Sequence, residues 1–428
     1  MRGPAAGLIV LATAFGAAAL GAPAPAHAQI DLFSREAISG VVDVRAAYSD
    51  GEESWVDGGL GKARAAKGGS LSLAEADLIW RPRVGWNLSG LVVVQAQPDM
   101  PDPVGVSEAY VTYKPTPSGP VRYAVKAGVF YPPISQEHEG GAWLVSDSIT
   151  PSAINSWVGE ELRTGGVEFK ATAALGGQEV AATLGAFGWN DTSGTLVSMR
   201  GWALGDQKAV IDGAFPLPKL SAFMTGRQTE YTTPVLEIDG RVGFYGRLDW
   251  SPSGRLALNA LYYDNAGDLI SNTPEGPARP EGKEWAWDTR FWNVGATAVL
   301  DDRTTLKAQV MRGVTLMGFP RPRGIWIDVD YDSAYLSATR KLGEGAEAAS
   351  LYGRVDWFDI VDNTYQDIDN NAEHGWAFTA AYKRPLNERV TWLVEALRID
   401  SRRNDRVRFG LDASQSQTVL QSSLRFAL

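Results

Sequence analysis

From Ala28 to its last residue, the chain repeats one unit of alternating polar and apolar residues. Each unit is a run of about ten residues, a tight turn, a second run and then a long polar loop. Such alternation is typical of a β-strand with one polar and one apolar face. A closed antiparallel β-barrel in a bilayer needs this rhythm, because its strands face lipid on one side and a water-filled lumen on the other.

Sixteen such runs can be placed along the chain, and seven short turns and eight longer loops connect them. We expect strands at 38–48, 70–81, 86–97, 106–114, 121–130, 163–173, 178–189, 240–251, 255–264, 284–300, 304–314, 327–341, 348–358, 374–384, 389–400 and 416–428. The even number puts both termini and the short turns on the periplasmic side and the long loops outside. The count becomes eighteen if region 190–239 adds a membrane hairpin.

The alternation also predicts which side chains face the lumen. Asp43 and Arg45 in the first strand, and Glu75 and Asp77 in the second, are expected to point inward, with Ala74 facing lipid. A Lys or Arg that faced lipid would cost about 2–4 kcal/mol near the midplane, and acids less. A sixteen-stranded barrel is wide enough to leave an aqueous channel.

One strand departs from the alternation. In 284–300 the pattern slips near Phe291 and Trp292, which predicts a β-bulge there.

The first 28 residues are typical of a signal peptide for export. Arg2 supplies a positive charge, 5–20 is apolar, and Ala26-His27-Ala28 is a cleavage site, so residues 29–428 should form the mature barrel. The chain has no cysteine, and so an exported protein of this size would not depend on disulfides. We expect the protein in the outer membrane of the cell.

Composition supports a membrane barrel and argues against nucleic acid. The net charge is -10, whereas a nucleic-acid partner requires a basic surface. The 15 Trp and 14 Tyr side chains favour a membrane–water interface. The alternative of a soluble β-sandwich or propeller would not separate short from long connections so strictly.

Loop 131–162 is the candidate constriction of the pore. It mixes apolar side chains with acids, a composition that suits a loop packed inside a barrel better than one in water. We predict a transverse field at the constriction between its acids and cations on neighbouring walls, and the residues are Glu137, Glu139, Asp147, Glu160, Glu161, Arg122, Lys126 and Lys170. These acids predict a weak cation preference. The alternative is an external loop that packs on other loops or at a trimer contact.

The sequence offers little for catalysis or for a cofactor. After the leader, the only histidines are His138 and His374, and no metal-spaced Cys/His set or phosphate-binding glycine loop is present. The alternating acids Asp328, Asp330 and Asp332 have no closing Glu at calcium-loop spacing, which favours a solvated acidic rim. We therefore expect neither enzymatic activity nor a cofactor.

The last eight residues, 421–428, resemble the C-terminal insertion signal of Gram-negative outer-membrane barrels. Gln421, Phe426 and Leu428 fit its polar and hydrophobic positions. Ser423 stands in place of the usual Gly, and the chain ends in Leu rather than Phe.

The overall plan resembles Gram-negative porins, and 128–169 is similar to porins of the phosphate-selective porin O/P type. This resemblance implies diffusion of small hydrophilic solutes or ions by a homotrimer in outer-membrane lipid. It transfers no ligand specificity, because the sharp match is confined to that segment. The wall charges are too mixed for a phosphate-selective ladder of basic residues. The alternative is a surface hydrolase or adhesion barrel that works through its long loops.

Overall fold

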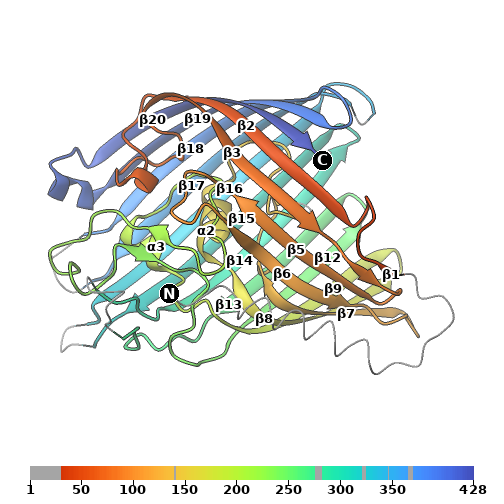
Figure 1. Ribbon diagram of the computed structural model, residues 1–428, viewed down its shortest axis with the longest axis horizontal. Coiled ribbons are helices and arrows are strands. Elements are labelled where there is room, and N and C mark those ends of the chain that lie inside the picture. Colours follow the sequence, from red (N-terminus) through yellow and green to blue (C-terminus); the bar gives the residue numbers. More distant parts are fainter. Residues whose placement is uncertain (1–29, 139–140, 275–281, 321–323, 346, 365–369) are drawn as a thin grey trace.

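The computed structural model describes residues 30–138, 141–274, 282–320, 324–345, 347–364 and 370–428. The expected signal peptide, 1–28, lies outside the described residues. Within them, one antiparallel sheet closes into a barrel, and two helices lie inside it (Figure 1). The sheet has eighteen strands, of which two, β1 (Ile30–Asp31) and β4 (Arg83–Val84), are short extra strands that pair with each other. Sixteen strands therefore form the wall, as predicted.

The wall strands run in chain order around the barrel. They are β2 (Ile38–Ser49), β3 (Gly68–Trp80), β5 (Leu88–Ala96), β6 (Val104–Tyr113), β7 (Val121–Phe130), β8 (Thr164–Leu175), β9 (Gln178–Gly188), β12 (Gly243–Ser253), β13 (Leu256–Asp264), β14 (Asp288–Asp301), β15 (Thr304–Met317), β16 (Ile327–Lys341), β17 (Ser350–Asp362), β18 (Glu373–Pro385), β19 (Val390–Arg403) and β20 (Ser414–Ala427). Short 3-10 turns lie at Trp55–Asp57 and Asn404–Phe409 in the outer loops.

The barrel closes where its last strand meets its first. β20 pairs with β2 in antiparallel register from Val41↔Ala427 to Ser49↔Val419. The strands on either side of region 190–239, β9 and β12, pair directly with each other. That region forms only the short hairpin of β10 (Phe215–Pro216) and β11 (Tyr231–Thr232), so the count stays at sixteen.

Alternating side chains divide between the lumen and the outer surface as the pattern predicts. On β2, Asp43 and Arg45 are 1% and 5% exposed, whereas Val44 between them is 37% exposed. Polar side chains therefore face inward and apolar ones outward, the arrangement that a bilayer requires.

The predicted lipid-facing position of Ala74 is wrong, because a β-bulge lies there. The register runs from Asp43↔Glu75 to Val44↔Leu73, so Ala74 is an extra residue on its strand. It points inward and is buried, while Leu73 takes the outward position with 40% exposure. A bulge shifts the alternation by one residue, which a strict period of two cannot anticipate.

The bulge predicted near Phe291 and Trp292 is also misplaced. The register of β14 is continuous there on both sides and shifts only between Val299 and Asp301, beside the periplasmic turn. Phe291 is buried in the lumen and Trp292 faces outward. The apparent slip arose because Phe291 is an apolar residue on the inner face.

Aromatic side chains ring the outer wall at both ends of the strands. Tyr113, Tyr123 and Trp250 lie near the periplasmic turns, and Trp292 and Trp376 near the outer ends, and all five are exposed. Two aromatic girdles that flank an apolar belt are the signature of a membrane-spanning barrel. The barrel architecture therefore places the chain in the outer membrane, as predicted.

The described residues include no helix that is long and apolar enough to cross a membrane.

Replacing Leu184 with Arg tests the outward face. Leu184 lies in the middle of β9, points away from the lumen and is 64% exposed. A cation there would face hydrocarbon, and we expect the unfolding free energy to fall by about 2–4 kcal/mol. Ala257→Arg is the matched control, because Ala257 is an accessible residue on the inner face of β13. Unfolding in urea, with the protein in detergent, can be monitored by heat-modifiable gel mobility. An equal loss of stability in both variants would contradict the assignment of Leu184 to the outward face.

Candidate functional site

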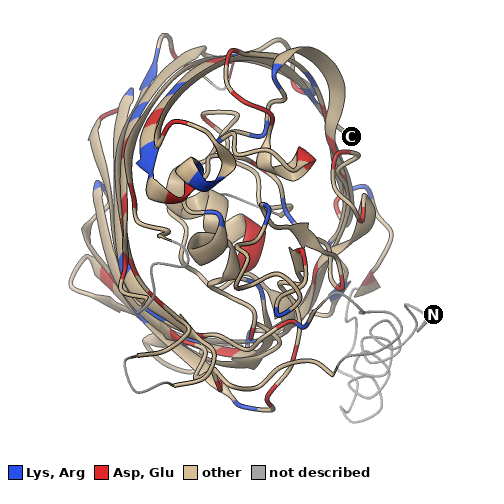
Figure 2. Ribbon diagram, turned by 90° about the vertical axis from the view of Figure 1, so that its left-hand side faces the viewer, with Lys and Arg blue, Asp and Glu red and all other residues tan. Residues whose placement is uncertain are grey.

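Two long connections fold into the lumen rather than away from it (Figure 2). The first inner loop, 131–163, joins β7 to β8 and carries α2 (Ala153–Glu161). The second inner loop, 189–242, joins β9 to β12 and carries α3 (Thr195–Met199). Every residue of both helices is buried. The placement of the first inner loop agrees with the prediction of a loop packed inside the barrel.

Side chains of the wall satisfy the backbone at the start of α2. The Ser152 hydroxyl caps the helix by accepting from the Asn155 N–H at 3.3 Å. Asp356 on β17 accepts from the Ala153 N–H at 3.1 Å. Glu395 on β19 accepts from the backbone N–H groups of Ile149 and Thr150 at 2.7 and 3.1 Å. Two wall acids thus supply acceptors for N–H groups that a helix start and its approach leave unpaired.

Arg354 on β17 joins the wall to the first inner loop. Its guanidinium donates to the carbonyl oxygens of Thr150 and Pro151 at 2.9 and 2.8 Å. It also forms ion pairs with Asp356 at 2.7 Å and Glu137 at 3.2 Å, and its side chain is fully buried. One buried cation therefore fixes the loop at several points.

A hydrophobic core fills the outer half of the lumen. Trp157 of α2 packs edge-on against Tyr331 of β16 and Trp202 of the second inner loop, with ring centroids 5.2 and 6.0 Å apart. Inward-facing wall residues from several strands join this core and are almost completely buried: Phe187, Tyr245, Tyr263, Phe291, Met311, Val329, Phe358, Ile360, Leu397 and Ile399. The expectation of a water-filled lumen is wrong for this part of the barrel.

The two inner loops also interlock. Glu160 of α2 pairs with Arg200 at 2.7 Å. Glu161 accepts from the Leu196 N–H at 3.0 Å and from the Trp157 indole N–H at 2.6 Å. Burial raises the pKa of Glu161 to about 7, and the hydrogen bonds from Leu196 and Trp157 oppose that rise.

The acids predicted for the constriction anchor the first inner loop instead of facing Arg122, Lys126 and Lys170. Their described partners lie elsewhere: Glu137 pairs with Arg354, Asp147 with Lys383 at 3.1 Å, Glu160 with Arg200, and Glu161 binds backbone and indole N–H groups. Glu139 lies outside the described residues. The structure therefore does not bring these acids together with the three predicted cations.

Arg122, Lys126 and Lys170 lie on the periplasmic half of the inner wall. Arg122 pairs with Glu179 at 2.7 Å, and both side chains are more than half exposed. Lys126 pairs with Glu168 at 3.0 Å and lies 4.0 Å from the centre of the Phe130 ring. Lys170 is exposed on the inner face of β8. These cations face an accessible part of the lumen.

We call this part of the lumen the vestibule. Its charged wall residues are the cations Arg81, Arg122, Lys126, Lys170, Arg247, Lys383 and Arg425 and the acids Glu168, Glu179 and Asp249, and the loop acid Asp147 also borders it. Each of the four acids forms an ion pair with one of these cations, and Arg425 pairs with the buried Asp43 at 3.1 Å. Arg81 and Lys170 have no acidic partner among the described residues, so the vestibule carries an excess of positive charge there.

Sequence reasoning missed the second inner loop as part of the lumen. It identified region 190–239 as a long connection that could add a membrane hairpin. The available signal was a set of apolar residues, including Leu196, Val197 and Trp202, that a loop in water would not need. All three are completely buried.

His138 has a structural environment. Its Nδ1 lies 2.9 Å from the Ser135 hydroxyl, which also accepts the backbone N–H groups of Glu137 and His138 in a local turn. Its ring stacks on Trp143 with centroids 4.0 Å apart. Burial, with Lys208 and Lys307 nearby, holds the pKa of His138 well below its usual value. It therefore stays neutral and packed near pH 7.

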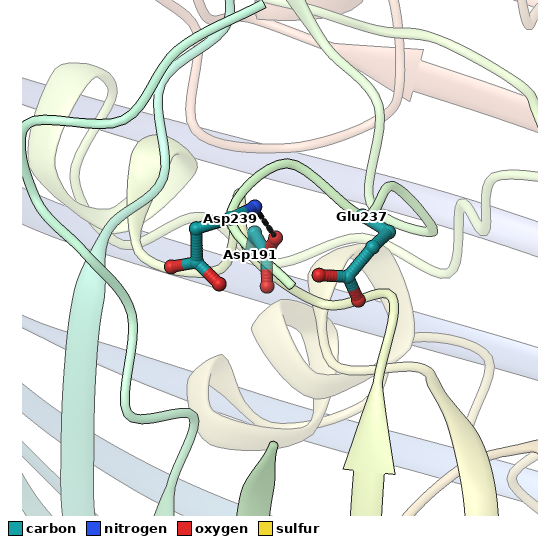
Figure 3. Close-up of side chains that lie close together, drawn as sticks. All are labelled: Asp191, Glu237 and Asp239. Carbon is teal, nitrogen blue, oxygen red and sulfur yellow. Dashed lines mark hydrogen bonds between the residues drawn. The ribbon is translucent and has the colours of Figure 1, made fainter. Parts of the chain in front are cut away.

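A group of three acids lies where the second inner loop leaves and re-enters the wall. Carboxylate oxygens of Asp191, Glu237 and Asp239 lie within 4.8 Å of one another (Figure 3). Asp191 accepts the backbone N–H groups of Ile238 and Asp239. Burial and the two neighbouring acids raise the pKa of Asp191 to about 7. These bonds shape the return of the loop.

The acids of the expected outer rim project from β16. Asp330 accepts from the Asn363 side chain at 2.9 Å, and Asp332 lies 3.7 Å from Arg312. Together with Asp328 they occupy alternate positions at the outer end of the strand.

Comparison with known proteins identifies the fold. No family model and no curated protein matches the chain, so the resemblance to the phosphate-selective type gains no support. Among solved structures, a loop-deletion mutant of OmpT, an outer membrane protein of Vibrio cholerae, matches with a TM-score of 0.51 at 9% identity. The match covers 94% of this chain and 99% of that one.

Two further solved structures match over most of their length. An anion-selective porin from Comamonas acidovorans has a TM-score of 0.50 at 13% identity, covering 94% of this chain and 100% of that one. OprB from Pseudomonas putida has a TM-score of 0.50 at 10% identity, covering 91% and 94%. At these identities the likeness shows the fold alone, and that fold is an outer-membrane β-barrel.

Replacing Arg354 with Met tests how the first inner loop is anchored. The change leaves Glu137 and Asp356 buried without their cation, so we expect a loss of about 3–5 kcal/mol in unfolding free energy. Arg122→Met is the matched control, because the exposed pair with Glu179 should contribute about 1 kcal/mol or less. Equal losses in urea unfolding would show that Arg354 is not an anchor.

Proposed function

We propose that the protein is an outer-membrane porin through which small hydrophilic solutes and ions diffuse passively. The observation that carries this proposal is the vestibule, an accessible and charged inner surface inside a closed sixteen-stranded barrel. A barrel whose only task was structural would have no need for a charged inner wall open to water. The first inner loop narrows the lumen above the vestibule.

We propose an anion preference, which is opposite to the sequence-based expectation. The cation preference rested on loop acids facing the pore, and the described ones are held in ion pairs or by N–H groups. The described part of the vestibule instead carries more cations than acids, and Arg81 and Lys170 have no acidic partner among the described residues. Fixed charges that line a pore attract the opposite ion and repel the like one.

We favour a channel over the alternative of a surface hydrolase or adhesion barrel. A hydrolase of the Ser–His type needs an accessible histidine that an acid orients. His138 is packed on Trp143, and His374 faces outward from β18 beside Arg402. We propose bilayer lipid and a homotrimeric assembly as partners, the latter on the resemblance to porins.

Planar-bilayer recording of the purified protein tests this proposal. We expect open conductance steps and, in a KCl gradient, a reversal potential of the sign that chloride passage produces. Lys170→Glu should move the reversal potential toward the cation value, because it reverses an exposed charge of the vestibule.

Arg389→Glu is the control, since it makes the same charge change in an exposed periplasmic turn. A bilayer that stays silent at all protein concentrations would refute the channel. A reversal potential of the cation sign in the unmodified protein would refute the anion preference alone.

A further inference from the structure

The inner wall behind the second inner loop has two unlike parts. Against β13 to β17 the loop meets aromatic and aliphatic side chains such as Tyr263, Phe291 and Phe358. Against β2, β3 and β5 it meets charged and amide side chains, which are Arg45, Glu75, Gln95 and Gln97, and Asp43 and Asp77 are buried on the same strands. Apolar wall suits a permanent core, whereas a wall of this second kind suits contact with water.

One segment, 204–213, covers this polar part of the wall, and we call it the strap. Its contacts with β2, β3 and β5 are ionic or hydrogen-bonded. Asp206 pairs with Arg45 at 2.7 Å and with Arg64 at 3.0 Å. Those two guanidinium groups hold the pKa of Asp206 well below its usual range. The strap is therefore charged where it meets the wall.

Further contacts of the strap with the wall have the same character. Lys208 forms an ion pair with Glu75, and its backbone N–H donates to the Gln97 side chain at 2.9 Å. The Gln95 side chain donates to the Lys208 carbonyl at 2.9 Å. The Ile211 N–H donates to the Val106 carbonyl of β6 at 2.7 Å. Water can replace bonds of this kind, but it cannot replace the packing of the aromatic core.

The wall beneath the strap is incompletely satisfied. Asp77 and Gln95 lie directly opposite each other on β3 and β5. The amide oxygen of Gln95 is buried with no hydrogen-bond donor among the described residues, and the buried carboxyl group of Asp77 has only its acidic neighbour Glu75 as a hydrogen-bond partner there. Buried acceptors without donors cost free energy that hydration would recover. The covered state therefore carries a penalty that uncovering the wall would remove.

We propose that the strap is a displaceable gate over a polar, water-compatible conduit along β2, β3 and β5. The rest of the second inner loop stays docked on the aromatic core when the strap moves. The conduit leads from the outer loops to the vestibule. This inference rests on the proposed channel function, and it adds the place where solute passes the filled half of the lumen.

A disulfide lock tests the movement, and the chain has no cysteine to interfere. A Cβ built on Gly105 of β6 lies 2.7 Å from the Val210 Cβ of the strap, and a small shift brings this to the roughly 3.8 Å of a disulfide. In the double variant Gly105→Cys/Val210→Cys, oxidation should form the disulfide and fix the strap. We expect this to lower conductance at least about twofold, and we expect reductant to restore it. Each single variant is the control and should not respond to reductant.

A labelling experiment tests the strap without relying on conduction. Gln95→Cys places a thiol under the strap, and a membrane-impermeant maleimide should reach it slowly. Adding Asp206→Ala should raise the labelling rate about tenfold, because it removes the partner of Arg45 and Arg64. A thiol at Ala257, in the open vestibule, is the control and should label equally in both backgrounds.

The outcomes separate the strap from the channel. Locked and unlocked barrels that conduct equally, with labelling unaffected by Asp206→Ala, would overturn the gate. Silent bilayers with labelling that depends on Asp206 would overturn the channel and leave the strap standing. Heat-modifiable mobility confirms that each variant folds. Arg64→Ala, which removes one partner of Asp206 from an outer loop, replaces Asp206→Ala if that variant does not fold.

Discussion

The constraint on which this structure depends is that every backbone N–H and C=O at membrane depth must find a partner inside the protein. The pairing of β20 with β2 meets it by closing the ladder. Closure at sixteen strands then creates a second demand, because a ring of that width cannot fill its interior with its own side chains. The two inner loops fill the interior with apolar residues whose exposure to water would be unfavourable.

Buried charged side chains of the barrel bind the inner loops and hold them in place. Arg354, Asp356 and Glu395 point inward as wall residues of a pore would, yet each binds the backbone of the first inner loop. Burial makes the charged form of the Lys62 side chain less favourable. It pairs with Glu373, while burial together with Arg403 and Arg200 lowers its pKa to about 8. The more accessible charges line the vestibule, and three of them, Arg247, Lys383 and Arg425, also donate to backbone carbonyls of the first inner loop.

The strands could be predicted because side chains alternate with a period of two residues in any barrel wall that faces lipid on one side and a polar lumen on the other. The strands at 121–130 and 327–341 have the bounds that alternation gave. Prediction failed at Ala74, where one extra residue reverses the faces. It failed for Glu137 and Glu160 because the partner of a loop acid depends on the path of the loop across the lumen. No local period encodes that path.

Both α2 and α3 lie in a dry core inside the barrel, although each belongs to a loop. Hydrogen–deuterium exchange of the native protein in micelles can measure this, since protection reports hydrogen bonds that water cannot reach. We expect peptides spanning 153–162 and 195–203 to exchange as slowly as β15 and β16. Exchange of these peptides within seconds, at the rate of the periplasmic turns, would contradict it.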